Sequence, residues 1–372
     1  MMSKGLAWGA LLLTLLWGLL ALAARALGAG QGGGVLAVAT DGRGLHLVDV
    51  NLGIVAALRT PFAPDHFTLS PGGAQMAFSA DNTLYLLDID SGYLRSFSMP
   101  NSFFYGESWA PDGQQLAFVI AGGESSQIYV LRGGELRRLS QESWRDFAPA
   151  WSPDGRQIAF LSARGGWPQL FVMDADGSNA RRLSGRHFID YFRWSPAGDY
   201  IAYMVRTDVD TEIYSVRLAD GVITNVSHST ARDGLFNWAP DGARLAFASL
   251  RDSGREQIFV VNADGSGLEA LSDGSTFDMM PLWSPDGAAL LYVCGERLRT
   301  LNLCLMNAQG RRPLDERLYN LSPAWSPDGR QIAFLSTRDG SLQLYVTDSE
   351  QGGVRRLTVD LPLLNMAPVW LP

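Results

Sequence analysis

The sequence has almost no lysine, few histidines and only two cysteines. Lys4 is the only lysine, so arginine supplies nearly all of the 30 basic side chains, against 38 acidic ones. The resulting net charge of −8 argues against a nucleic-acid partner, because binding to nucleic acid depends on neutralising its phosphates with basic side chains. We therefore expect no nucleic-acid partner.

Long apolar runs are also missing, with one exception near the amino terminus. Residues 5–24 carry no charged side chain and are bounded by Lys4 and Arg25. As a helix this run would span ~30 Å, the thickness of a bilayer core. We interpret residues 1–27 as a signal anchor, with a cleaved signal peptide as the alternative, and residues 28–34 as a glycine-rich linker. Either reading places the rest of the chain outside the cytoplasm, on a single-pass membrane protein or as a secreted or periplasmic one.

The rest of the chain repeats one short motif. Its clearest copy is Trp-Ser-Pro-Asp-Gly-Arg-Gln-Ile-Ala-Phe at 325–334. Related copies lie roughly 40 to 45 residues apart and begin at Leu69, Trp109, Trp151, Trp194, Trp238 and Trp283. A period of this length is typical of propellers and solenoids, in which neighbouring repeats stack to bury a shared core.

One repeat encodes four short strands. In the copy at 148–184, the predicted strands cover 148–151, 157–162, 169–174 and 181–184. The Ser152-Pro153-Asp154-Gly155 segment predicts the first turn, since proline presets φ at one corner and glycine tolerates positive φ at another. Four antiparallel strands make one propeller blade, and the tryptophan of each first strand is expected to pack between blades. The predicted fold class is therefore an all-β propeller.

The two ends of the chain supply the parts of one further blade. Eight third strands can be counted, but only seven first strands precede them. Residues 35–60 provide three strands without a first strand, and residues 367–372 provide a first strand with nothing after it. Pairing these ends would close a ring of eight four-stranded blades over residues 35–372 and remove its exposed sheet edges. A seven-bladed ring with frayed ends is the alternative.

Cys294 and Cys304 are predicted on neighbouring strands of one blade. A disulfide requires their Cβ atoms to lie roughly 3.5–4.5 Å apart, which one strand register allows and another prevents. Two buried free thiols are the default expectation, and a disulfide is the alternative. Neither the spacing of the cysteines nor any accompanying histidine indicates zinc.

The repeat resembles that of the TolB-type, WD-like β-propellers. The resemblance rests on the 325–334 motif, the Asp174-Ala175-Asp176-Gly177 turn and the Arg181-Arg182-Leu183 segment, and it covers residues 35–372. It implies an extracytoplasmic scaffold that binds other proteins or envelope components. Similar repeats form the gating propellers of the prolyl oligopeptidase family, but the Gly-x-Ser-x-Gly elbow of that family's catalytic domain is missing from this sequence.

The loops that join each fourth strand to the next first strand are rich in aromatic and acidic residues. Asp146, Asp233 and Asp278 each precede a blade tryptophan by five residues, and Asp190 precedes one by four. Oxygens repeated at this position would create a negative funnel near the ring axis. Alternatively, each aspartate forms an Asx-type turn that leads into the strand. The candidate binding residues are Tyr105, Trp144, Asp146, Asp190, Tyr191, Asp233, Asp278 and Tyr319.

Catalytic and metal-binding residues do not cluster in the sequence. Three of the four histidines, His66, His187 and His228, fall in these loops but belong to different blades. A shared metal would need their nitrogens within ~2.0–2.1 Å of one ion, so we expect no metal and no cofactor. We expect a non-catalytic, membrane-tethered propeller that recognises a protein or glycan through its loop-rich face. The alternatives are a propeller-type hydrolase or lyase, and an accessory propeller of a separately encoded peptidase or transporter.

Overall fold

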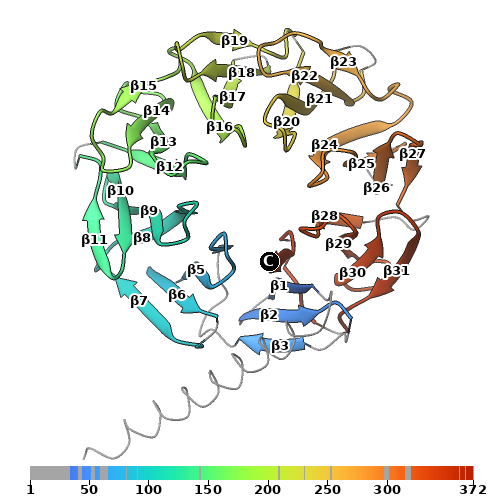
Figure 1. Ribbon diagram of the computed structural model, residues 1–372, viewed down its shortest axis with the longest axis horizontal. Helices are drawn as coiled ribbons and strands as arrows, with labels where there is room; N and C mark the ends of the chain where they lie inside the picture. Colours follow the sequence, from blue (N-terminus) through green and yellow to red (C-terminus); the bar gives the residue numbers. More distant parts are fainter. Residues whose placement is uncertain are drawn as a thin grey trace, which may run out of the picture.

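The computed structural model shows a ring of eight antiparallel sheets, each with four strands (Figure 1). We call these sheets blades 1 to 8, in chain order. The structure describes residues 34–371, apart from 41–43, 52–54, 59–65, 81, 90, 142–143, 208–209, 230, 252–253, 297–300, 315–319, 360 and 365.

Blade 1 combines both ends of the described chain. Its strands are β1 (Val35–Thr40), β2 (Gly44–Asp49), β3 (Val55–Leu58) and β32 (Val369–Leu371). Blades 2 to 4 contain β4 (His66–Leu69), β5 (Gln75–Ala80), β6 (Thr83–Asp88), β7 (Leu94–Ser98), β8 (Phe103–Trp109), β9 (Gln115–Gly122), β10 (Ser125–Arg132), β11 (Glu135–Arg138), β12 (Asp146–Trp151), β13 (Gln157–Ser162), β14 (Gln169–Asp174) and β15 (Arg181–Arg182).

Blades 5 to 8 follow the same order of four consecutive strands. They contain β16 (Phe188–Trp194), β17 (Tyr200–Arg206), β18 (Thr211–Arg217), β19 (Ile223–Asn225), β20 (Asp233–Trp238), β21 (Arg244–Ser249), β22 (Gln257–Asn262), β23 (Glu269–Ala270), β24 (Phe277–Trp283), β25 (Leu290–Gly295), β26 (Asn302–Asn307), β27 (Gly310–Pro313), β28 (Asn320–Trp325), β29 (Gln331–Ser336), β30 (Gln343–Asp348) and β31 (Gly352–Arg356).

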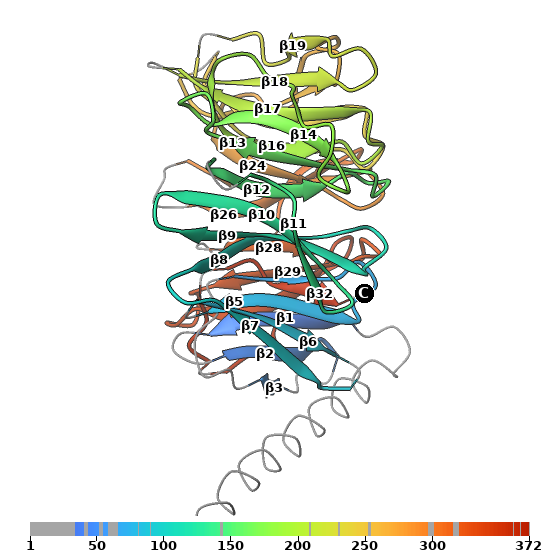
Figure 2. The same cartoon turned by 90° about the vertical axis from the view of Figure 1, so that its left-hand side faces the viewer.

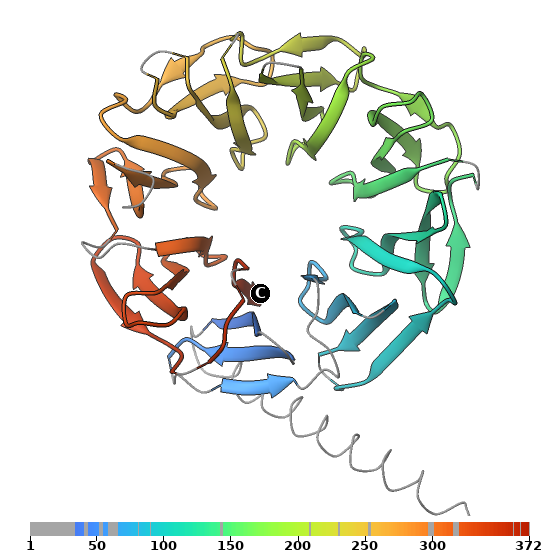
Figure 3. The same ribbon diagram turned by 180° about the vertical axis from the view of Figure 1, so that it is seen from behind.

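The first strand of each blade lies nearest the ring axis and the fourth lies at the rim (Figure 1). Seen edge-on, the strands run along the axis, so their connections emerge on two opposite faces (Figure 2). We call the face with the connections between first and second and between third and fourth strands the turn face. The other connections form the loop face. Figure 3 shows the same ring from behind.

The carboxyl-terminal strand closes the ring, which confirms the eight-bladed prediction and excludes the seven-bladed alternative. β32 pairs antiparallel with β1, with Leu36 opposite Trp370 and Ala37 opposite Val369. The strand order β3-β2-β1-β32 makes β32 the inner strand of blade 1. This pairing covers the β1 edge that would otherwise present unpaired backbone groups to solvent.

The core lies between blades rather than inside any single one. Leu36 and Val38 of β1 pack against blade 8, whereas Ala37 and Ala39 pack against blade 2. This division follows from the alternation of side chains along a strand. The predicted packing role of the tryptophans is confirmed at Trp151, which is buried in the cluster between blades 3 and 4.

The Ser-Pro-Asp-Gly segments form the predicted turns between first and second strands. In blade 4 the amide of Gly155 donates to the carbonyl of Ser152 at 2.9 Å, and Gly155 has a φ of 70°. The Ser152 hydroxyl donates to Asp154 and accepts from the amide of Gln157, which begins the next strand. The hydroxyl of Ser152 also lowers the pKa of Asp154.

Several first strands begin earlier than the sequence predicted, because each of these strands contains a bulge. In blade 4, β12 begins at Asp146 and not at 148, and the register shifts between Phe147 and Ala150. Ala148 takes the positive φ, 51°, that the bulge requires. Candidate residues that we had placed in loops therefore lie in strands, namely Tyr105, Asp146, Asp190, Tyr191, Asp233 and Asp278.

The expectation of two free thiols is wrong, because Cys294 and Cys304 form a disulfide. In the register of β25 and β26, Cys294 lies opposite Asn302 and Tyr292 lies opposite Cys304. The two cysteines are thus diagonal neighbours on one face of the sheet, with their Cα atoms 5.8 Å apart. This separation lies within the range that a disulfide spans.

The predicted anchor at 1–27 lies outside the described residues, as does the predicted linker apart from Gly34. The carbonyl of Gly34 accepts a hydrogen bond from the amide of Val50 at the start of blade 1. Among the residues that the structure describes, no helix has the length and apolar character needed to cross a membrane.

Candidate functional site

Three of the predicted site aspartates are buried at the start of first strands. Asp146, Asp233 and Asp278 expose 0%, 1% and 0% of their surface. Each carboxylate lies beside a guanidinium of its own blade. The closest oxygen-to-nitrogen distances are 3.2 Å for Asp146 and Arg164, 3.3 Å for Asp233 and Arg251, and 3.0 Å for Asp278 and Arg311. Their charges are therefore compensated inside the blades, and any contact of these aspartates with a ligand stays a prediction.

Blade 4 shows how such an arginine is held. Asp146 lies opposite Ser162, and Arg164 follows two residues after that serine. The Arg164 Nε donates to the Ser162 hydroxyl at 2.7 Å, and its Nη2 donates to Asp146 at 3.2 Å. The guanidinium carbon lies 4.3 Å from the centre of the Phe171 ring. We call this arrangement the arginine clamp, because one side chain holds the first three strands of the blade together.

The arginine clamp recurs in two other blades. Blade 6 builds it from Asp233, Ser249 and Arg251, and blade 8 builds it from Asn320, Ser336 and Arg338. In each case the guanidinium also lies over the ring of the third strand, which is Phe259 or Tyr345. A short sequence pattern accompanies this feature. A Ser-x-Arg triplet begins at the last residue of the second strand in each of the three blades.

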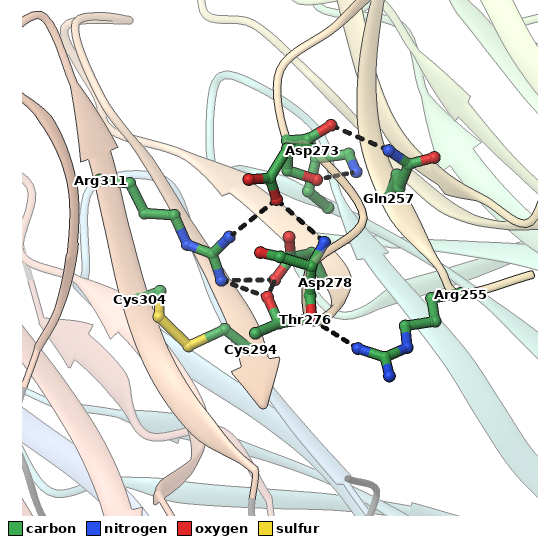
Figure 4. A network of polar contacts seen from close by, with 11 residues as sticks. Arg255, Gln257, Asp273, Thr276, Asp278, Cys294, Cys304 and Arg311 are labelled. Atoms are coloured by element: carbon green, nitrogen blue, oxygen red, sulfur yellow. Dashed lines mark hydrogen bonds and ion pairs between the residues drawn. A yellow bond between two sulfur atoms is a disulfide. The ribbon is translucent and has the colours of Figure 1, made fainter. Parts of the chain in front are cut away.

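Blade 7 replaces the arginine clamp with the disulfide and a different arginine (Figure 4). Cys294 takes the serine position opposite Asp278, and Cys304 takes the position that a ring holds in the clamped blades. Arg311 reaches Asp278 from β27, the outer strand, and its guanidinium lies over the Tyr292 ring at 5.6 Å from the ring centre. Asp278 also accepts from the Thr276 hydroxyl at 2.8 Å.

Burial shifts the pKa of two of these acids upward. Burial raises the pKa of Asp233, and the hydrogen bonds from Ser227 and Ser249 together with Arg251 only partly offset this effect. Burial likewise raises the pKa of Asp278, against the opposing influence of Thr276 and Arg311. A raised pKa can accompany acid–base catalysis, but that chemistry needs contact with a substrate, and these two residues are at most 1% exposed.

The predicted aromatic residues are packed rather than freely exposed. Trp144 is half-buried and stacks on the Arg164 guanidinium, whose carbon lies 3.7 Å from the ring centre. Tyr191 meets Phe236 of the next blade edge-on, at 5.4 Å between ring centres. Burial raises the pKa of Tyr191 and also that of the half-buried Tyr105. Tyr319 lies outside the described residues.

Asp190 belongs to a different environment, an exposed patch on the loop face between blades 4 and 5. Its carboxylate forms an ion pair with Arg206 at 2.5 Å, and Arg206 lies over the ring of Phe188. The Phe188 ring lies 5.7 Å from that of Trp167, which is 64% exposed. We call Trp167, Phe188, Asp190 and Arg206 the loop-face patch.

Sequence reasoning missed Trp167 in this patch. It lies in the connection between the second and third strands of blade 4, whereas the predicted binding residues come from the loops between blades. A hydrogen bond from the amide of Ile189 to the carbonyl of Pro168 joins this connection to blade 5. The two halves of the patch are therefore held together by the backbone.

The structure does not gather the four aspartates around one point. Asp146, Asp190, Asp233 and Asp278 lie on the first strands of four successive blades, and none of the described contacts joins one to another. Within the described part of the chain, no group of three histidine, cysteine, aspartate or glutamate side chains could hold a metal ion. His187 instead stacks on Tyr214.

Three curated proteins share part of this sequence. An uncharacterized protein of Agrobacterium fabrum is 34% identical over 30% of this chain and 38% of its own length. The uncharacterized peptidase YuxL of Bacillus subtilis is 30% identical over 27% of this chain and 16% of its own length. The Tol-Pal system protein TolB of Alcanivorax borkumensis is 31% identical over 24% of this chain and 21% of its own length. The matches thus span well under half of each relative.

Two solved structures support the fold over most of the chain. The dihydro-heme d1 dehydrogenase NirN aligns with a TM-score of 0.66 at 17% identity, covering 90% of this chain and 74% of that one. Dipeptidyl peptidase 4 of Porphyromonas gingivalis also aligns with a TM-score of 0.66 at 13% identity, covering 88% of this chain and 59% of that one. Likeness at this level of identity concerns the fold alone.

The repeats themselves match a described family. Residues 62–208 and 188–311 match the TolB beta propeller domain, and together they span more than half of the chain. The blade motif, the closed ring and this match agree, and the chain belongs to the TolB β-propeller family.

Proposed function

We propose that this protein is a non-catalytic binding propeller that recognises a protein or glycan through its loop-face patch. The exposed Trp167 carries the proposal. Its ring is 64% exposed beside Phe188, and the Asp190–Arg206 ion pair lies next to it. Tryptophan and arginine are enriched among the residues that dominate binding energy at protein interfaces. The flat faces of aromatic rings suit protein and sugar ligands alike.

The buried aspartates support a binding role over a catalytic one. The candidate acids Asp146, Asp233 and Asp278 are fully or almost fully buried and lie beside guanidinium groups. A general acid or base must come within hydrogen-bond reach of the reacting group. In this arrangement a substrate on either face would not touch these carboxylates.

We further propose that the propeller lies outside the cytoplasm, tethered by residues 5–24. The disulfide between Cys294 and Cys304 supports this location, because disulfides persist in oxidising compartments and are rare in the cytosol. Fractionation of native cells tests the tether. The full-length protein should stay in the membrane pellet through high-salt and carbonate washes. A soluble form that begins near residue 24 would show a cleaved signal instead.

Site-specific photocrosslinking tests the binding face. A photoreactive phenylalanine analogue at position 167 should give a discrete crosslinked product in native cells. Tyr93 provides the matched control, because it is also 64% exposed but lies in the turn between β6 and β7, on the opposite face. Equal products from positions 167 and 93 would contradict the proposal, as would no product from position 167. Arg206→Gln should reduce the yield at position 167, because it removes the cation of the patch.

An accessory role beside a separately encoded peptidase is the second candidate function. The match to the uncharacterized peptidase YuxL favours it over a lyase, although it covers 16% of that protein. Identification of the partner crosslinked at position 167 by mass spectrometry separates the two candidates. A hydrolase partner supports the accessory role, and a non-enzymatic protein or a glycan supports the scaffold role.

A further inference from the structure

A cleft of about 330 Å³ opens on the turn face where blades 2 and 3 meet. Arg95 enters it from the outer strand of blade 2, and Trp109 and Arg132 enter it from blade 3. The turn formed by Gly133 and Gly134 borders the same cleft. It therefore lies on the opposite face from the loop-face patch.

Arg95 lacks the hydrogen bonds to the next blade that two of its four arginine equivalents make. By strand register, four arginines of other blades occupy the same position as Arg95, namely Arg137, Arg181, Arg312 and Arg355. Arg137 of blade 3 and Arg312 of blade 7 are the two that bond to the next blade. Arg137 donates to the carbonyls of Ala175 and Asp176 in the next blade, at 3.2 and 3.4 Å. Arg312 likewise donates to two carbonyls of the next blade, those of Ser349 and Glu350.

Arg95 instead faces the Gly133–Gly134 turn without bonding to it. Its Nη1 lies 3.8 Å from the place that a Cβ on Gly134 would occupy. Within the described part of the chain, Arg95 forms no hydrogen bond and no ion pair. Its guanidinium therefore keeps its donors available at the edge of the cleft.

Arg132 places a second positive charge where other blades carry an acid or an amide. The last residue of the third strand is Asp49, Asp88, Asp174, Asn262, Asn307 or Asp348 in six of the other blades. Blade 5 has Arg217 at this position, and Asp220 compensates its charge at 2.6 Å. Arg132 forms no ion pair among the described residues, although Glu135 lies opposite it in the strand register. The nearby Asp112 accepts a hydrogen bond from the amide of Gln114 in its own turn.

The indole of Trp109 adds a polar group to the same cleft. Its N–H is buried and has no acceptor among the described residues, whereas the equivalent Trp194 and Trp238 donate to the preceding blade. Trp151 and Trp283 share this property, so the indole alone does not mark a site. Trp109 lines its cleft together with two arginines.

We propose that this cleft binds a carboxylate group carried by an acidic peptide segment of a partner protein. Two guanidinium groups that form no ion pair among the described residues match a carboxylate, which accepts paired hydrogen bonds from an arginine. Because the chain carries a net charge of −8, the molecule as a whole repels acidic peptides. Attraction of such a peptide is therefore confined to a local cationic site. The site is separate from the loop-face patch and does not depend on its function.

Binding of a labelled hexaglutamate peptide to the full-length protein tests this proposal by fluorescence anisotropy. We expect Arg95→Gln combined with Arg132→Gln to weaken binding at least tenfold. Arg181→Gln combined with Arg182→Gln is the matched control, since it removes the same charge from an exposed outer strand of blade 4 and should change binding less than twofold. Equal weakening by both double variants would overturn the proposal, as would undetectable binding to the wild-type protein.

A charge-reversal variant and a competition assay test the cleft and the chemistry of its ligand separately. Arg132→Asp restores the acid found in blade 4, so it should abolish binding while leaving the melting temperature unchanged or higher. If this variant binds normally, the cleft is not the site.

Inorganic phosphate and glutarate serve as competitors. Displacement of the peptide by glutarate at the lower concentration supports a carboxylate site, and displacement by phosphate at the lower concentration overturns that assignment.

Discussion

Trp370 donates its indole N–H to the backbone carbonyl of Ala324 at 3.1 Å. Trp194 donates in the same way to Ala150, one blade earlier in the chain. The closing strand β32 thus docks against blade 8 as an internal first strand docks against its neighbour. The junction of the chain ends therefore follows the geometry of the repeat.

Removing the closing strand should open the ring. Deletion of residues 367–372 exposes the edge of β1 and removes Trp370 from the core between blades 8 and 1. We expect a clearly lower melting temperature and aggregation that depends on concentration. Trp370→Ala alone should cost about 3–5 kcal/mol of unfolding free energy, as truncation of a large core aromatic does. Trp167→Ala is the control for an exposed tryptophan, and an unchanged melting curve for the deletion would disprove closure.

Replacing Asp233 by asparagine should preserve the clamp in blade 6. Blade 8 already uses Asn320 at the equivalent position, and Arg338 donates to it at 2.7 Å. We expect Asp233→Asn to change the unfolding free energy by less than about 1 kcal/mol. Asp233→Ala should cost about 3 kcal/mol, because it leaves buried donors of the clamp without an acceptor. Equal losses in urea unfolding would show that the negative charge itself is required.

The stability that Asp233 contributes should also depend on pH. Because burial raises the pKa of Asp233, the folded state holds its proton more tightly than the unfolded state does. Protonated Asp233 therefore contributes its full stabilisation at pH values below its pKa in the unfolded state. This stabilisation is lost as the pH rises through the higher pKa of the folded state. Stability curves measured from about pH 4 upward should therefore fall less steeply for Asp233→Asn than for the wild type. Parallel curves would contradict the raised pKa.

Reduction of the disulfide should destabilise blade 7. The bridge joins residues 10 apart in sequence across β25 and β26, and disulfides typically contribute about 2–4 kcal/mol. We expect a reductant to lower the melting temperature of the wild-type protein. The double variant Cys294→Ala with Cys304→Ala should melt at a lower temperature in both conditions and should not respond to the reductant. If the wild type shows no response while its thiols are fully reduced, the bridge does not stabilise the fold.

The loop-face aromatics should differ in their effects on stability. Trp144 stacks on Arg164, and Tyr191 packs against Phe236, so replacing both by alanine should cost roughly 1–3 kcal/mol in total. Trp167→Ala should change stability by less than roughly 0.5 kcal/mol, since most of its ring faces solvent. Thermal melts of the two variants measure the difference. A larger loss from Trp167→Ala would mean that the patch serves packing rather than binding.

The sequence by itself determined the fold and its closure. The recurring Trp-Ser-Pro-Asp-Gly motif marks each first strand and turn, and these are local features that residue types encode directly. The leftover strands at 35–60 and 367–372 predicted the eighth blade, because a closed ring leaves no unpaired edge. The repeat also predicted that neighbouring blades stack, because one sheet cannot bury both of its faces alone.

Only the tertiary structure decided which polar residues are buried and which are exposed. Asp146 seemed to stand in a loop, but a bulge at Ala148 carries it into a strand beside Arg164. Alanine does not mark such a bulge, because its positive φ is imposed by the surrounding sheet. The disulfide likewise depends on a register that places Cys294 diagonal to Cys304. Register and burial arise from contacts between segments that are distant in the sequence.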